Sequence, residues 1–202
     1  MIDYVSTFIF FFAVIDPIGT IPVFIAVTSK FEASVKRKIA IQAAIISSFI
    51  LVFFIIAGEV ILNAIKVPLS SFQIAGGIIL FLFALTMIFG ESKPEEELKS
   101  LDSSNDTAIF PLSVPSIASP GAMLAAVLMT ENTQYSFMQQ LQTTGVMLSV
   151  VLVVLLFMLA SSFIHRYIGN SGASIISRVM GLILSSVAIN NILEGVKVYF
   201  DL

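Results

Sequence analysis

The sequence predicts an all-α membrane protein with six transmembrane helices, arranged as two inverted three-helix repeats. Three observations support this fold class: the apolar composition, six long apolar segments, and short motifs that recur in the second half. Only 11% of the 202 residues are charged, against about 25% in a typical soluble domain. The mean hydropathy is +1.02. A chain this apolar would expose large sticky patches in water, whereas lipid can solvate it.

A membrane span needs about 20 predominantly apolar residues. Six segments satisfy this requirement, and most are flanked by polar residues: 4–28, 38–62, 69–89, 109–130, 141–165 and 175–200. The first lacks a basic region and a small-residue cleavage site, which favours a retained helix over a signal peptide. We expect one transmembrane domain over 1–202, in which an acidic, solvated loop (90–108) separates repeats over 4–89 and 109–200.

Three motifs recur in order at nearly constant spacing. DPIG (16–19) matches SPGA (119–122), and FIIAGEVI (54–61) matches FMLASSFI (157–164), both 103 residues later. QIAGGIIL (73–80) matches RVMGLILS (178–185) at a spacing of 105. A unit with three spans is odd, so its second copy must enter the membrane upside down. This pattern is typical of secondary transporters with inverted repeats.

Basic residues predict the orientation. Most lie in the loops after the first, third and fifth spans: Lys30, Lys36, Arg37, Lys38, Lys93, Lys99 and Arg166. The other side carries Lys66 and Lys197. Because cytoplasmic loops are enriched in Lys and Arg, both termini should lie outside the cytoplasm, with the 91–107 loop inside.

The first and fourth spans contain helix-breaking motifs at equivalent places. The first has Asp16, Pro17, Gly19 and Pro22, and the fourth has Pro111 followed by the run 115–121. Proline removes an amide donor and clashes with the preceding turn, so both helices should open or kink in mid-span. Unpaired backbone survives at membrane depth only where protein or a watery cavity satisfies it. A packing kink explains one such break, but a symmetric pair favours a binding site at the midplane.

Freed amides at a half-helix N-terminus suit a carboxylate, and freed carbonyls suit an ammonium group. The predicted substrate-binding residues combine both breaks with two mid-span amides: Asp16, Pro17, Gly19, Thr20, Pro22, Ser116, Ser119, Pro120, Gly121, Asn190 and Asn191.

Several of these side chains have a structural alternative. Asp16 could hold the ammonium or a proton, or it could cap the helix that begins at Pro17. Asn190 and Asn191 could line the pathway or bond to another helix. Glu59 is expected at the interface, and Arg178 is expected to snorkel or to clamp a loop. Close helix packing is the expected role of three glycines: Gly76, Gly77 and Gly181.

Taken together, FPLSVPSIASPGAM (110–123), QIAGG (73–77), ISRVMGLIL (176–184) and DPIGTIP (16–22) resemble the MarC family over essentially the whole chain. The resemblance implies an inner-membrane transporter, an exporter or exchanger, of small neutral amino acids such as glycine and alanine. Two positions depart from the family. Asp16 stands where the family often has Asn, and Ser119 where it often has Gly.

Other function classes fit less well. A small-solute channel is the alternative, since broken helices also line pores. An enzyme is not expected, because the chain has no Cys, its one His ends a span, and Asp16 is the one Asp clearly within a span, so serine-type and aspartyl-type sites are both incomplete. For the same reason no metal or cofactor is expected. No basic field suggests nucleic acid. The expected partners are a zwitterionic amino acid and lipids, with protons as coupling ion and a homo-oligomer left open.

Overall fold

The computed structural model describes residues 2–89, 107–132 and 134–201, and the predicted acidic loop falls mainly outside them. In this part of the chain every regular element is helical. The elements in chain order are α1 (Tyr4–Ile15), α2 (Pro17–Thr28), α3 (Ala33–Ala64), α4 (Leu69–Phe89), the irregular segment η1 (Ala108–Ile117), α7 (Pro120–Leu128), α8 (Phe137–Leu159) and α9 (Ser161–Tyr199).

The described helices are long and apolar enough to cross a membrane. Five spans have the required length and apolar composition, with α1 and α2 together forming one span of 25 residues. The bent pair of η1 and α7 makes a sixth if it is one span. Their exposed surface is rich in large apolar side chains, as expected where lipid is the solvent. The prediction of an all-α membrane protein is therefore confirmed.

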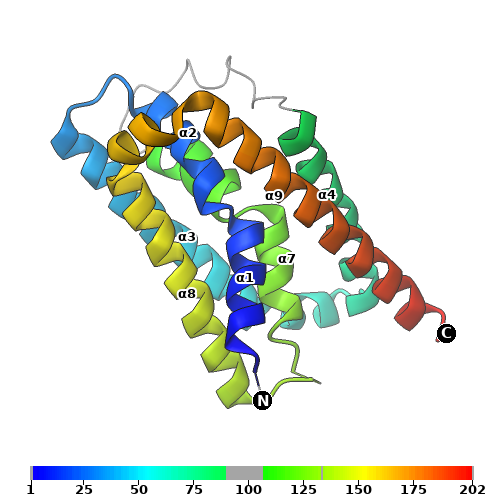
Figure 1. Ribbon diagram of the computed structural model, residues 1–202. Coiled ribbons are helices and arrows are strands. Elements are labelled where there is room, and N and C mark those ends of the chain that lie inside the picture. Colours follow the sequence, from blue (N-terminus) through cyan, green and yellow to red (C-terminus); the bar gives the residue numbers. More distant parts are fainter. Residues whose placement is uncertain (1, 90–106, 133, 202) are drawn as a thin grey trace.

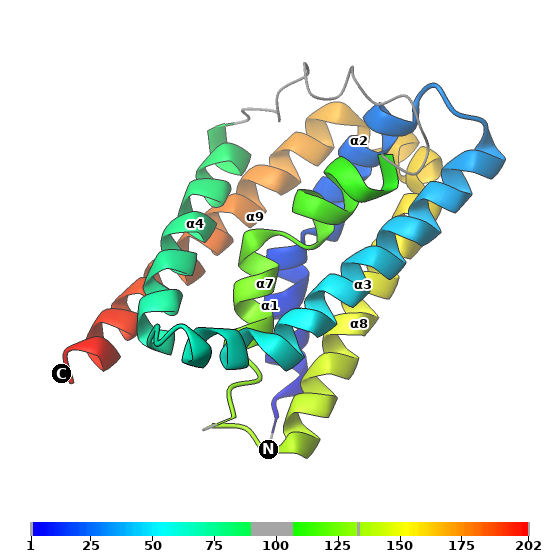
Figure 2. The same cartoon turned by 180° about the vertical axis from the view of Figure 1, so that it is seen from behind.

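The two interrupted spans lie between two antiparallel helix pairs (Figures 1 and 2). One pair is α3 with α8, and the other is α4 with α9. Corresponding helices of the two halves run in opposite directions, since α1, α2 and α4 ascend in Figure 1 while η1, α7 and α9 descend. The superposition of 4–89 on 109–200 by a two-fold axis stays a prediction.

Small residues let α4 and α9 approach until their backbones meet. Each helix carries three of them at seven-residue spacing, and these face one another across the pair: Ser70, Gly77 and Ala84 on α4, and Gly181, Ala188 and Gly195 on α9. A Cβ on Gly77 would lie 3.0 Å from the Ala188 carbonyl oxygen. A Cβ on Gly181 would lie 2.9 Å from that of Ala84. Close approach of this kind replaces the hydrophobic driving force that is missing in lipid.

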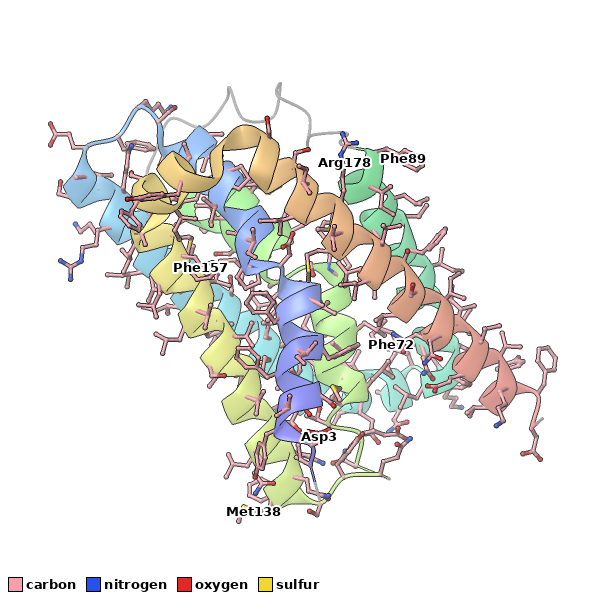
Figure 3. All side chains as sticks on the ribbon, in the orientation of Figure 1. Asp3, Phe72, Phe89, Met138, Phe157 and Arg178 are labelled. Carbon is pink, nitrogen blue, oxygen red and sulfur yellow. The ribbon has the colours of Figure 1, made fainter. Side chains whose placement is uncertain are left out.

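The two ends of the bundle differ in the residues they carry. Figure 3 shows Asp3 and Met138 at one end, and Phe89 with Arg178 at the other. The N-terminus and the C-terminus both lie toward the first end in Figure 1. Arg178, expected to snorkel or clamp, thus lies at the same end as Phe89, the last described residue before the predicted acidic loop. Which end faces the cytoplasm stays a prediction.

The predicted end of the fifth span is wrong, whereas the predicted sixth span agrees with the apolar stretch Ser174–Tyr199. The sequence predicted spans over 141–165 and 175–200, but α8 ends at Leu159 and α9 already begins at Ser161. Ala160 (φ −91°, ψ 6°) makes the whole turn. The polar stretch after it contains no proline, so the helix continues where the polarity suggested a loop.

Candidate functional site

The first break is a single residue, Asp16. Its backbone is left-handed (φ 50°, ψ 69°), a region that Asp and Asn enter more easily than other side chains with a Cβ. Its amide still bonds to the Phe12 carbonyl and so closes α1. Its Oδ1 accepts a hydrogen bond from the Gly19 amide at 3.0 Å and so caps α2. Pro17 at the first helical position needs no donor there. Asp16 therefore ends one helix and starts the next.

Pro22 does not extend this break, which corrects the prediction. It lies inside α2, which continues to Thr28, and α1 with α2 is not among the strongly bent helix pairs. Pro22 lacks the amide that would bond to the fourth residue back, in the first turn of α2, yet that turn is already fixed by the Asp16 cap. A membrane helix tolerates such a proline when its neighbours satisfy the freed groups.

The second break is longer. Phe110 and Val114 have extended backbone (φ −128° and −129°) inside η1, each directly before a proline. Proline disfavours helical backbone in the residue that precedes it. The chain turns helical again at Pro120, directly after Ser119, whose Oγ accepts from the Ala122 amide at 3.1 Å. The resulting bend between η1 and α7 is 55°.

Both breaks use the same local chemistry. Asp16 precedes Pro17 and caps α2, while Ser119 precedes Pro120 and caps α7. A capping oxygen followed by proline is a strong start signal for a helix. The two half-helices therefore begin at equivalent positions of the two halves, and their N-terminal ends carry the positive end of the helix dipole.

The breaks contact each other directly. Ser119 Oγ donates a hydrogen bond to the Val14 carbonyl oxygen at 3.2 Å, across 105 residues of sequence. Thr20 Oγ1 lies 3.4 Å from Ser116 Oγ and also donates to the Asp16 carbonyl at 3.1 Å. All four side chains that make these contacts or caps are buried: Asp16, Thr20, Ser116 and Ser119. Polar groups from both breaks therefore share one site.

Apolar side chains surround this polar site. Val14, Ile15, Ile117 and Ala118 are fully buried beside it. A low local dielectric strengthens the hydrogen bonds that are made and raises the cost of those that are not. Among the described residues no group of three His, Asp or Glu side chains could hold a metal ion.

Two serines that the sequence analysis missed fasten the second break to α3. Ser113 Oγ lies 3.2 Å from the Ala43 carbonyl oxygen and 2.6 Å from that of Ala108. Ser47 Oγ donates to the Ser113 carbonyl at 3.4 Å. A serine between two prolines was the available signal, because broken backbone needs nearby hydroxyl groups.

Both glycines of the predicted site lie under close contacts. A Cβ on Gly19 would overlap the Asp16 carboxylate, which is the capping group itself. A Cβ on Gly121 would overlap Leu80 Cδ1 and lie 3.0 Å from Val14 Cγ1. Neither position has room for a side chain.

The two asparagines lie on α9, away from the hydrogen bonds described above. Asn190 is exposed. The Asn191 Nδ2 atom is buried and has no hydrogen-bond partner within the described residues. It is in the helical turn after Ala188, which packs on Gly77. That Asn190 or Asn191 contributes to the site stays a prediction.

Glu59 lies at the exposed end of α3. Its Oε2 accepts hydrogen bonds from the Asn132 amide at 2.9 Å and from Asn132 Nδ2 at 2.8 Å. Asn132 Oδ1 in turn accepts from Gln140 Nε2 at 2.9 Å. These contacts fit the interfacial position expected for Glu59, where it holds the α7–α8 connection against α3.

Known proteins resemble the chain over nearly its full length. Residues 1–200 match the family model described as MarC family integral membrane protein. A UPF0056 membrane protein of Archaeoglobus fulgidus is 33% identical over 195 residues, which cover 95% of this chain and 91% of that protein. The UPF0056 membrane protein YvbG of Bacillus subtilis is 33% identical, with coverage of 97% and 95%. No solved structure matches significantly.

Proposed function

Since this chain belongs to the MarC family of integral membrane proteins, we propose that it is a secondary transporter of small neutral amino acids. Glycine and alanine are the proposed substrates, and export or exchange across the inner membrane is the proposed direction. The observation that carries the proposal is the contact between the two breaks, where Ser119 Oγ reaches the Val14 carbonyl oxygen. Inverted-repeat transporters bind their substrates at such paired interruptions.

The substrate carboxylate binds at the beginning of α2 or α7 in this mechanism. Amides and dipoles at helix N-termini favour anions, and both half-helices begin at the site. The ammonium group lies against the Asp16 carboxylate or against carbonyl oxygens of the breaks. Thr20 and Ser116 supply hydroxyl groups that can bond to either end of a zwitterion.

The size of the site supports a small substrate. Gly19 and Gly121 have no room for even a Cβ, and buried aliphatic side chains fill the space beside them. A large side chain would have to displace close-packed neighbours, which costs about 1–3 kcal/mol or more. This cost rises with the size of the substrate side chain and is lowest for glycine and alanine.

The experiment is uptake by purified protein in proteoliposomes. Labelled glycine and alanine should accumulate, while a larger neutral amino acid such as leucine should not. Measurements with and without an imposed pH gradient test protons as coupling ion. Preloaded unlabelled glycine should speed entry of labelled glycine in an exchanger, whereas a small-solute channel would show no such acceleration. Absence of glycine and alanine uptake under all these conditions contradicts the proposal.

A further inference from the structure

α4 and α7 interlock through two leucine–glycine contacts. Leu80 of α4 packs on Gly121 of α7, and Leu124 of α7 packs on Gly76 of α4, where a Cβ would lie 2.6 Å from both leucine δ-carbons. Each leucine is 1% exposed. The two contacts are therefore alike in chemistry and burial.

They differ in their distance from the site. Gly121 is the second residue of α7, next to Pro120 and two residues after the cap Ser119. Leu80 Cδ1 and Val14 Cγ1 both lie against the position that a Cβ on Gly121 would take. Leu124 is one helical turn farther along α7, and Gly76 is one turn before Leu80. Only the Leu80 contact covers the helix N-terminus at which the breaks meet.

We propose that Leu80 sets the upper size limit of the transported amino acid. This inference rests on the proposed function, in which the substrate carboxylate binds at the start of α7. A carboxylate held there places the substrate α-carbon beside the Gly121 backbone, so its side chain points into the space that the Leu80 δ-methyl groups occupy. A hydrogen or a methyl group needs only a small displacement of the Leu80 δ-methyl groups, and a branched side chain needs a larger one.

Truncation of Leu80 tests the inference. Leu80→Ala removes Cγ, Cδ1 and Cδ2 directly above the α7 N-terminus. Uptake of labelled glycine, alanine and valine would be measured in proteoliposomes for wild type and variant. A hydrophobic pocket discriminates about tenfold or more per methylene, so the valine-to-glycine uptake ratio should rise by at least about tenfold. Leu80→Val, a smaller truncation, should raise the ratio less and serves if the alanine variant does not fold.

Leu124→Ala is the matched control, because it removes the same atoms from an equally buried interlock one turn away from the site. Its valine-to-glycine ratio should stay at the wild-type value. An unchanged ratio in both Leu80 variants, or an equal rise in Leu124→Ala, overturns the inference while glycine uptake by the wild type leaves the proposed function intact. A wild type without glycine or alanine uptake contradicts the proposed function and the inference with it.

Discussion

Substitutions of Asp16 separate its structural roles from a role in transport. The residue adopts left-handed backbone between α1 and α2, and its Oδ1 accepts from the Gly19 amide at 3.0 Å. Asn keeps a capping oxygen and tolerates the same backbone. Gly keeps the backbone freedom but has no cap. Ala loses the cap and, unlike Asp and Asn, has no polar side chain to make this backbone conformation easier.

The change in stability of each variant follows from two contributions, the helix cap and the left-handed backbone. Loss of an N-cap to Ala costs about 0.5–2 kcal/mol, whereas a cap replaced by Gly costs only a few tenths. Left-handed backbone costs a residue with a Cβ about 1–2 kcal/mol. Wild-type Asp16 already has a Cβ and so already bears much of this backbone cost. Asp16→Ala should therefore lower the free energy of unfolding mainly through the lost cap, by about 0.5–2 kcal/mol. Asp16→Gly should lower it by a few tenths, and Asp16→Asn should stay close to wild type.

Two measurements check this series. Thermal unfolding in detergent, followed by circular dichroism, should rank the variants Asn, Gly, Ala from most to least stable. Glycine uptake against pH should have the same profile in Asp16→Asn as in wild type if the carboxylate only caps α2. An Ala variant as stable as the Asn variant would refute the capping argument. A flattened pH profile in Asp16→Asn would instead show that the carboxylate carries a proton or holds the ammonium.

Three further predictions test the site, the packing and the topology. Gly19→Val and Gly121→Val should abolish uptake while the protein still reaches the membrane. Gly145→Val is the control and should transport normally, because nothing lies within 4 Å of the added Cβ. Full uptake by both site variants would refute the site. Gly181→Val should lower the free energy of unfolding by about 1–3 kcal/mol, because the new side chain presses on the Ala84 carbonyl of α4. An unchanged melting temperature would show that α4 and α9 can separate freely. Single cysteines, introduced into a chain that has none, should be labelled from outside at both termini and from the cytoplasm in the 91–107 loop; the reverse pattern would contradict the orientation.

The sequence predicted the spans and the breaks because both depend on local chemistry. Apolar length alone determines which segments can cross a membrane, and the predicted 4–28 and 69–89 agree with α1–α2 and α4. Proline acts on its own residue and on the one before it, so Phe110 and Val114 could be expected to leave the helix. These effects need no knowledge of the tertiary structure.

What could not be predicted depends on contacts between distant segments. Ser47 and Ser113 are 66 residues apart, and only the packing of α3 against η1 brings them together. Leu80 reaches Gly121 across two different halves of the chain. The polar first part of α9 lies at one end of the bundle (Figure 1), where a polar segment can stay helical.

The two breaks occupy equivalent positions but free different amounts of backbone. At Asp16 the amide still bonds to Phe12 and the carbonyl still accepts from Thr20, while the nearby Val14 carbonyl accepts from Ser119 Oγ. The second break contains two prolines and two extended residues, and hydroxyl groups from Ser47 and Ser113 stand in for some of the lost helical bonds. Since buried backbone groups need partners, a ligand that bonds to backbone has more to gain at the second break. The first break is centred on one residue, so Asp16 can be tested by changing its side chain, whereas the backbone groups of η1 cannot be tested in that way.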